Sequence, residues 1–210
     1  MVSNKNILIA QGGGPTNVIN QSLVGIIRQE KKYKSKILGS INGVNGIINN
    51  RFISLNKISE NDLKTIANTP GAALGSTRDK PDKKYCKEIL KILENKQISK
   101  FYYIGGNDSS DSLRIISEYA KDTKYKLQCI HIPKTIDNDL VCNDHTPGFG
   151  SAAKYVAQLF SGINYDVKSL PGVYLGIVMG RHAGFLTAAS SLLKKENDDG
   201  PNLIYIPESP

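Results

Sequence analysis

The sequence predicts an α/β fold built on a mostly parallel sheet with helices on both faces. Two observations lead to this prediction. Short apolar runs typical of strands alternate along the 210 residues with longer runs whose apolar residues recur at helical spacing. A glycine or proline turn follows the predicted strands, as expected for the strand–turn–helix units of a parallel sheet.

The predicted strands are short apolar runs. They are KNILIA (5–10), SKILGSI (35–41), KFYYIGG (100–106), LQCIHIP (127–133), VYLGIVMG (173–180) and NLIYIPE (202–208). Asp and Asn are poor strand formers, so the fourth strand stops near Pro133 and a polar loop, TIDND (135–139), follows it.

The predicted helices lie between these strands. They cover residues 16–30, 59–68, 82–96, 110–121, 150–163 and 182–195. Pro15 precedes the first helix, where a proline is tolerated. Ser59 and Asp62 form a weak capping box at the start of the second.

Composition excludes several classes of protein. No apolar run reaches the roughly 18 residues that a membrane span needs, and the amino-terminal stretch does not read as a signal peptide. The formal charge of +8 is explained by lysine-rich helix faces. It is compatible with an anionic small substrate, but no nucleic-acid-binding motif accompanies it. Three cysteines without CxxC spacing, Cys86, Cys129 and Cys142, favour reduced thiols in the cytoplasm.

Five turns are expected to meet at one edge of the sheet, because ligands of parallel sheets bind at the carboxyl ends of the strands. These turns are Gly12–Gly14, Gly105–Asp108, Pro133–Asp139, Met179–Arg181 and Pro207–Glu208. Glycine turns that lead into helices let backbone N–H groups approach an anion. They also serve as plain structural turns, and neither glycine turn matches GxxxxGK[ST] or a clean GxGxxG.

The polar residues of these turns have several readings. Asp137 and Asp139 could accept a proton, hold a metal, or form an Asx-type turn. Asn107 and Asp108 could be Mg²⁺ ligands or caps of the helix that follows.

The basic residues and the histidines leave similar choices open. Lys134 could bind a phosphate oxygen. Arg181 could bind a phosphate or a sugar hydroxyl, or be a plain surface arginine. His131 fits a core histidine, and neither His145 nor His182 has metal-ligand spacing.

The motifs resemble those of the phosphofructokinases, specifically the pyrophosphate-dependent branch, in the same order over nearly the whole chain. They are GGGPTNVIN (12–20), PGAALGSTR (70–78), GGNDS (105–109), PKTIDND (133–139), MGRHAGFLT (179–187) and IPE (206–208). The resemblance implies a phosphofructokinase-like, Rossmann-like fold. A donor-binding domain at 1–148 would be followed by the start of a sugar-phosphate-binding domain at 149–210, and this second domain is incomplete.

The resemblance also implies roles for individual residues. Asp137 would accept the proton of the 1-hydroxyl of fructose 6-phosphate, Thr135 would contact the sugar, and Asp139 would support Asp137 or the metal. Lys134 and Asp108 complete the implied catalytic set. The remaining assignments are donor-phosphate binding by Gly13, Gly14, Arg78, Gly106 and Lys134, and sugar-phosphate binding by Met179, Gly180, Arg181 and Glu208.

Two positions bear on the phosphoryl donor. ATP-using members usually carry glycine at the places of Asp108 and Lys134, whereas the pyrophosphate-using branch carries Asp and Lys. An aspartate would occupy and repel the space of a nucleotide α-phosphate, and the lysine would pair with pyrophosphate. Many members carry Asp, linked to the catalytic Mg²⁺, where this chain has Asn107. An amide oxygen can ligate Mg²⁺ without the charge.

The sequence therefore predicts phosphoryl transfer from pyrophosphate to fructose 6-phosphate, with Mg²⁺, in a cytoplasmic enzyme that forms homo-oligomers at full length. Two alternatives stay open: an ATP-dependent 6-phosphofructokinase, and a truncated subunit that binds phosphates without turnover. A nicotinamide-dependent oxidoreductase is disfavoured because GxGxxG is absent. No helix follows the last predicted strand to cover it, so we expect the chain to be the N-terminal piece of a longer protein.

Overall fold

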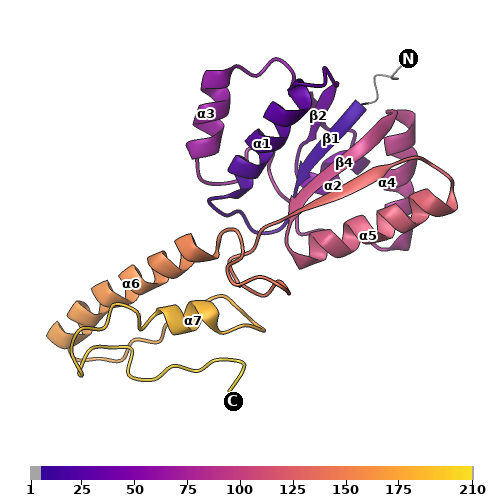
Figure 1. Cartoon of the computed structure of the whole chain (residues 1–210). Helices are drawn as coiled ribbons and strands as arrows, with labels where there is room; N and C mark the ends of the chain where they lie inside the picture. The colour runs from indigo at the N-terminus through magenta and orange to yellow at the C-terminus, as the bar shows by residue number, and fades with distance from the viewer. Residues whose placement is uncertain (1–5, 210) are drawn as a thin grey trace. The chain divides into compact units, whose positions relative to one another are not determined.

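The computed structural model describes residues 6–209 and contains two compact units, residues 1–134 and 135–210. The elements of unit 1 are β1 (Asn6–Gln11), α1 (Ile19–Lys31), β2 (Ile37–Ser40), α2 (Gly43–Ile48), β3 (Phe52–Ser54), α3 (Glu60–Asn68), α4 (Lys83–Asn95), β4 (Ile98–Gly105), α5 (Asn107–Asp122) and β5 (Gln128–Pro133). Unit 2 contains α6 (Phe149–Ser169) and α7 (Phe185–Ala189). Figure 1 labels these elements within each unit.

Unit 1 is a five-stranded sheet in the order β3-β2-β1-β4-β5. The four strands β2, β1, β4 and β5 run parallel, and only β3 is antiparallel to its neighbour. Helices α1 and α3 cover one face, whereas α2, α4 and α5 cover the other (Figure 1). The predicted α/β fold with a mostly parallel sheet is confirmed. Of the first predicted strand, Lys5 lies outside the described residues.

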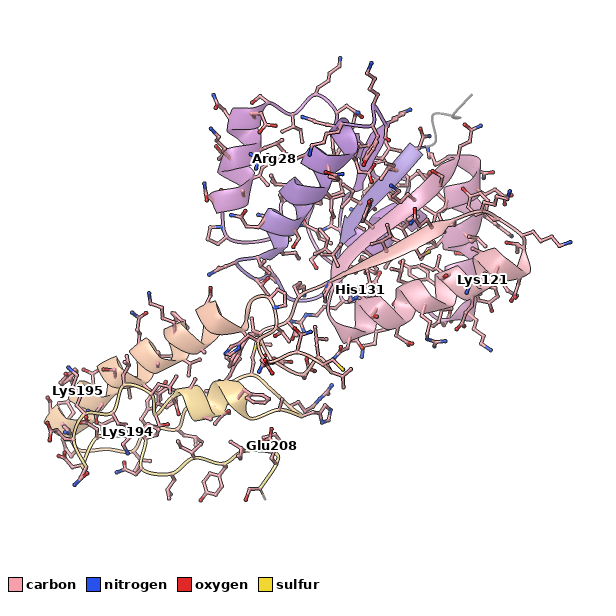
Figure 2. All side chains as sticks on the ribbon, viewed as in Figure 1. Arg28, Lys121, His131, Lys194, Lys195 and Glu208 are labelled. Carbon is pink, nitrogen blue, oxygen red and sulfur yellow. The ribbon has the colours of Figure 1, made fainter. Side chains whose placement is uncertain are left out.

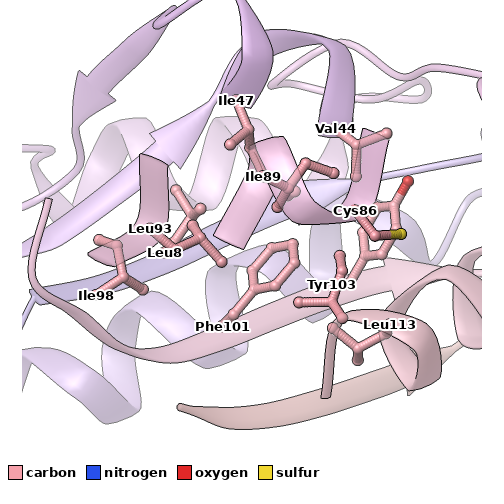
Figure 3. Close-up of a cluster of buried hydrophobic side chains, with 12 residues drawn as sticks. Leu8, Val44, Ile47, Cys86, Ile89, Leu93, Ile98, Phe101, Tyr103 and Leu113 are labelled. Atoms are coloured by element: carbon pink, nitrogen blue, oxygen red, sulfur yellow. The ribbon is translucent and has the colours of Figure 1, made fainter. Parts of the chain in front are cut away.

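Each face of the sheet has its own apolar core. On the α4 and α5 side, Phe101 and Tyr103 stack with ring centroids 5.7 Å apart and are surrounded by aliphatic side chains from the helices (Figure 3). On the α1 side, Ile19, Leu23 and Ile27 are fully buried against the sheet. Strands buried on both faces explain why the sequence shows continuous apolar runs rather than alternation.

Helix boundaries in unit 1 follow local capping chemistry. The Ser59 hydroxyl accepts the backbone N–H of Asp62 at 3.1 Å, which confirms Ser59 as the N-cap of α3. The Asp62 carboxylate accepts from the Ser59 hydroxyl at 2.7 Å, whereas in a full capping box it would accept from the Ser59 backbone N–H. Asp82 caps α4 by accepting the N–H of Tyr85 at 2.8 Å. Helix α2 and strand β3 were not predicted, because segments of six and three residues are too short to show a period.

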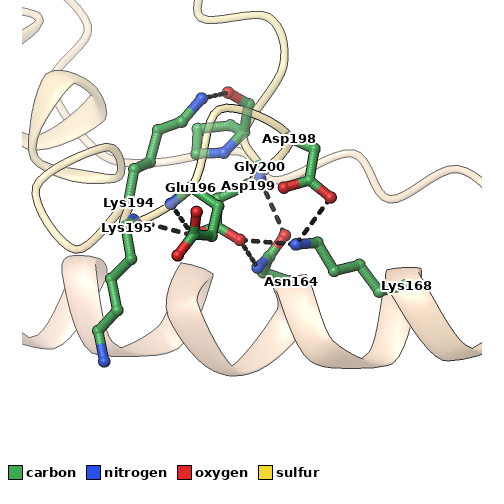
Figure 4. Close-up of polar contacts among 9 residues, drawn as sticks. Asn164, Lys168, Lys194, Lys195, Glu196, Asp198, Asp199 and Gly200 are labelled. Atoms are coloured by element: carbon green, nitrogen blue, oxygen red, sulfur yellow. Dashed lines mark hydrogen bonds and ion pairs between the residues drawn. The ribbon is translucent and has the colours of Figure 1, made fainter.

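Unit 2 packs α6 against α7 through Ala153, Leu186 and Ala189. A polar network fixes the following loop to α6. The Asp199 carboxylate accepts from Asn164, from Lys168 and from the backbone N–H groups of Lys195 and Glu196 (Figure 4). The bond from Lys168 lowers the pKa of Asp199 most, and the backbone donors and Asn164 add to this effect.

Two predicted strands of unit 2 are wrong. Residues 173–180 and 202–208 contain no β-strand, and the predicted helix at 182–195 is α-helical only over α7. Val173, Leu175 and Ile177 are 99%, 83% and 93% exposed. A strand needs a neighbour for its backbone ladder, and none is provided for these segments by the described residues.

The compact units separate after Lys134, earlier than the domain boundary predicted after residue 148. Residues 135–148 hydrogen-bond among themselves in unit 2, as in the bonds from Thr135 N to Pro147 O and from Thr146 N to the Asn138 side chain. The functional domain division stays a prediction. No helix in the described part of the chain is long and apolar enough to cross a bilayer.

Candidate active site

The site in unit 1 lies where the order of the sheet reverses. Strand β1 is central, β2 pairs with it on one side and β4 on the other. Glycine turns follow both β1 and β4, and the N–H of Gly12 donates to the carbonyl of Ile104 at 2.8 Å. Ligands of open parallel sheets bind at such a reversal, outside the carboxyl ends of the strands.

The first glycine turn is held against the loop that contains Arg78. Gly13 has a left-handed φ of +74°, and its N–H donates to Thr77 O at 2.9 Å. The Ser76 hydroxyl donates to Gly13 O at 2.5 Å. A Cβ atom on Gly13 would lie 3.0 Å from Nζ of Lys134. The turn therefore needs glycine both for its backbone angle and for room beside the lysine.

Lys134 joins the two glycine turns. Its side chain is buried, its ammonium donates to Gly14 O at 2.7 Å, and its N–H donates to Gly105 O at 3.1 Å. A Cβ atom on Gly14 would lie 3.8 Å from the Arg78 guanidinium, and one on Gly106 would lie 3.6 Å from Lys134 O. The predicted donor residues of unit 1 are thus neighbours. Two cationic side chains and backbone N–H groups in one place suit an anion.

Helix α5 begins at the second glycine turn. Its N-cap is Gly106, so Asn107 and Asp108 lie inside the first helical turn. The alternative that these two residues cap the helix predicted at 110–121 is therefore wrong. Both are exposed. The Asp108 carboxylate forms an ion pair with Lys80 at 3.1 Å. A carboxylate here interacts favourably with the helix dipole.

His131 supports the second turn from β5 (Figure 2). Its Nε2 lies 3.0 Å from Gly105 O. Burial lowers the pKa of His131 and the charge of Lys134 adds to this, while hydrogen bonds with Gly105 and Gly106 oppose the shift. The neutral ring therefore donates to the turn, and this residue belongs to the frame of the site rather than to the apolar core.

In unit 2, the TIDND segment forms a tight polar turn. The Thr135 hydroxyl accepts the N–H of Asp137 at 3.1 Å, a local bond typical of such turns. Asn138 is buried with φ +59°, and its side chain accepts from Thr146 N at 2.8 Å and donates to Asp144 O at 3.0 Å. Asp137 is half-buried, whereas Asp139 is exposed. The turn presents its two carboxylates in different environments.

The remaining predicted residues lie beside α7. Met179 is 57% exposed and Arg181 is exposed. Gly180 has φ +120°, and a Cβ atom there would lie 2.2 Å from Ala183 O. The Glu208 carboxylate accepts the N–H of Gly184 at 2.7 Å, at the start of α7 (Figure 2). Unit 2 thus holds Glu208 at the helix start and Arg181 on the turn that precedes it.

Sequence reasoning missed two residues that border the donor residues, Asp79 and Lys80. They belong to the charged run RDKPD (78–82), directly after the LGSTR loop. Their position next to a phosphate-loop motif was the available signal. Loops beside ligand-binding turns often carry functional side chains.

The residues of the donor site offer Mg²⁺ one protein oxygen ligand, the amide of Asn107. No group of three or more His, Cys, Asp or Glu side chains that could hold a metal is found among residues 6–209. Mg²⁺ commonly takes one or two protein oxygens and completes its shell with substrate phosphates and water. The exposed amide of Asn107, at the start of α5, fits that arrangement.

Known proteins resemble the chain over nearly its whole length. The chain is 60% identical over 204 residues to the pyrophosphate–fructose 6-phosphate 1-phosphotransferase of Rhodospirillum rubrum, covering 96% of this chain and 50% of that protein. It is 40% identical to the enzyme of the same name from Xanthomonas campestris pv. campestris, covering 99% of this chain and 52% of that protein. The chain spans about half the length of these curated relatives.

A solved structure and a family model match nearly the whole chain. The pyrophosphate-dependent phosphofructokinase of Marinobacter aquaeolei superposes with a TM-score of 0.85 at 36% identity, covering 98% of this chain and 54% of that one. The phosphofructokinase family model matches residues 6–210. The chain therefore belongs to the phosphofructokinase family.

Proposed function

We propose that the protein carrying this chain transfers a phosphoryl group from pyrophosphate to the 1-hydroxyl of fructose 6-phosphate, giving fructose 1,6-bisphosphate. One observation carries the choice of donor: a buried lysine, Lys134, has its ammonium 2.7 Å from Gly14 O, between two glycine turns. A lysine at this place gives pyrophosphate a fixed positive partner. The names of the relatives described above support the same donor.

The acceptor side of the proposal rests on the TIDND turn and the residues around α7. Asp137 accepts the proton of the 1-hydroxyl, Thr135 contacts the sugar, and Asp139 supports Asp137. The sugar phosphate is bound by Met179, Gly180, Arg181 and Glu208. Phosphoryl transfer asks the protein chiefly for positioning and charge neutralisation, which backbone-anchored turns can supply.

The donor side divides between charge and geometry. Gly13, Gly14 and Gly106 present backbone groups, while Arg78 and Lys134 supply positive charge to the phosphates. Asp108 fills space that a nucleotide would need. Asn107 would hold Mg²⁺ together with the donor phosphates, and the metal, when bound, neutralises phosphate charge.

The proposal includes the setting of the reaction. We place the protein in the cytoplasm as a homo-oligomer, with no nucleic-acid or membrane partner. All three cysteines are free, as expected in a reducing compartment. The charge of +8 suits anionic substrates.

The test is a donor comparison with the protein at its natural length. With Mg²⁺ and fructose 6-phosphate, pyrophosphate should support formation of fructose 1,6-bisphosphate, and ATP should not. Turnover with ATP and none with pyrophosphate would establish the ATP-dependent alternative instead. Binding of pyrophosphate without turnover would identify a non-catalytic subunit.

A further inference from the structure

The ion pair between Asp108 and Lys80 addresses an electrostatic problem. Asp108 stands in the first turn of α5, directly after the Gly105–Gly106 turn. If pyrophosphate binds there, as proposed above, a carboxylate beside the site repels the donor as well as the nucleotide that it excludes. A nearby positive charge would remove this cost for pyrophosphate.

Lys80 supplies a positive charge at the required place. Its ammonium lies 3.1 Å from Oδ1 of Asp108, and the two side chains are 69% and 70% exposed. Exposed ion pairs contribute little to the stability of a fold. Stability therefore gives no reason for this pair, whereas the local charge beside the donor turn does.

The backbone that carries Lys80 is anchored by its neighbour. The Asp79 carboxylate accepts from Asn45 Nδ2 at 3.2 Å and from the Tyr85 hydroxyl at 3.0 Å, and Asp79 N donates to the Thr77 hydroxyl at 3.1 Å. Burial tends to raise the pKa of Asp79, but hydrogen bonds from Asn45, Thr77 and Tyr85 outweigh it, so the pKa is lowered. The ionised Asp79 thus links α2 and α4 and fixes the backbone from which the Lys80 side chain projects.

Lys80 also lines a cleft of about 590 Å³ beside α2 and α4. The charged residues of the cleft are three acids and two lysines: Asp79, Asp82, Glu88, Lys80 and Lys84. Of the two lysines, Lys80 pairs with Asp108, while Lys84 forms no ion pair within residues 6–209. Lys84 is therefore a charge-matched comparison for Lys80.

We propose that Lys80 is the charge-compensating residue of the donor site. Its ammonium offsets the carboxylate of Asp108, so that Asp108 occupies nucleotide space without repelling pyrophosphate. Lys80 acts through Asp108 and is a positioning residue, not a phosphate ligand. This inference rests on the proposed pyrophosphate-dependent function.

The test is a double-mutant cycle in the natural-length protein, with KM for pyrophosphate as the measurement. Lys80→Met leaves the Asp108 carboxylate uncompensated and should raise KM about fivefold, with little change in kcat, the size expected of an exposed charge pair. In the Asp108→Asn background, Lys80→Met should change KM by less than about twofold relative to Asp108→Asn alone, because no carboxylate is left for Lys80 to compensate. Lys80→Arg should retain the wild-type value.

Two controls separate the outcomes. Lys84→Met removes the same charge from the same cleft and should leave KM unchanged, and the effect of Lys80→Met should shrink in high salt. An unchanged KM in Lys80→Met, or an equal rise in the Asp108→Asn background, would overturn the inference alone, the latter by making Lys80 a direct phosphate ligand. A wild-type protein without pyrophosphate turnover would overturn the proposed function, and this inference with it.

Discussion

Asp137 stands in a turn whose geometry is fixed by its own side chains. Thr135 accepts its N–H, and the buried Asn138 bonds to Thr146 and Asp144 on the far side of the loop. A general base must be held within hydrogen-bond reach of the proton that it removes. The turn therefore orders Asp137 before any substrate arrives, which is the property that a base needs.

Asp137→Asn keeps the shape of this side chain and removes its basicity. In the natural-length protein, kcat should fall about 10²- to 10⁴-fold while KM for fructose 6-phosphate changes little. Steady-state kinetics with pyrophosphate measure both constants. Asp144→Asn, an exposed carboxylate in the same loop, is the control and should retain activity. A loss confined to KM would make Asp137 a binding residue instead.

A substitution of Asp108 tests the choice of phosphoryl donor. Asp108→Gly removes a negative charge and opens space for the α-phosphate of a nucleotide, so kcat/KM should fall for pyrophosphate and rise for ATP. Adding Lys134→Gly should enlarge the shift, because the two residues would share one donor site. Asp111 is another exposed carboxylate near the start of α5. The Asp111→Gly protein should be less stable but should show no change in donor preference. An equal donor ratio in all variants would reject a selecting role for Asp108.

The candidate site could be read from the sequence only in part. GGGPTN, GGNDS and PKTIDND mark turns that could be named in advance, because glycine, proline and aspartate have local backbone preferences. Lys80 could not be named, because its partner Asp108 comes from another element and an ion pair across elements leaves no local pattern. Lys80 and Asp108 come together only when the sheet has formed.

At the scale of elements, the turns that follow β1 and β4 depend on where their glycines stand. Gly13 has a left-handed backbone and faces the ammonium of Lys134, whereas Gly25 lies in α1 with no atom within 4 Å of its missing Cβ. Substitution by alanine should therefore have opposite effects on stability at these two positions. One glycine is required by geometry, and the other only loosens its helix.

Gly13→Ala and Gly25→Ala form a matched pair. The first should destabilise the protein by roughly 1–2 kcal/mol, the cost of a left-handed alanine, and should weaken pyrophosphate binding by displacing Lys134. The second should stabilise it by about 0.5–1 kcal/mol, because alanine is the better helix former. Urea denaturation measures both values, and a pyrophosphate titration measures the binding. Equal effects at the two positions would contradict this account of the turn.

Helices and strands could be predicted from the sequence where a local apolar pattern is combined with a neighbouring element to pack or pair against. The long helices α1, α4 and α5 and the paired strands β1, β4 and β5 satisfy both conditions. Residues 173–180 have a strand-like composition, but composition cannot supply a neighbouring strand, and these residues are mostly exposed loop. Strand β3 has three residues and exists because β2 offers it an edge.

At the scale of the whole molecule, the two units differ in how they bury apolar surface. Unit 1 encloses two apolar clusters, one on each face of its sheet. Over residues 135–209, unit 2 has one small cluster and leaves Val173, Leu175 and Ile177 exposed. Apolar burial is the main favourable term in folding, so the two units should differ in their ability to fold alone.

A fragment of residues 1–134 should fold by itself. It should unfold cooperatively in urea and show little binding of the dye ANS, because its cores are closed. The fragment 135–210 is the comparison, and it should bind ANS strongly through its exposed apolar residues. A non-cooperative transition in the first fragment would show that unit 1 depends on the rest of the chain.

The Lys80–Asp108 pair also bears on how donor preference can drift during evolution. If Lys80 were lost first, the bare carboxylate would weaken the use of pyrophosphate before any other donor was gained, and selection would oppose that step. Losing Asp108 first also lowers the use of pyrophosphate, but the same step opens space for a nucleotide. Lineages that exchange pyrophosphate for a nucleotide should therefore change Asp108 before Lys80, and reconstructed ancestral sequences should preserve this order.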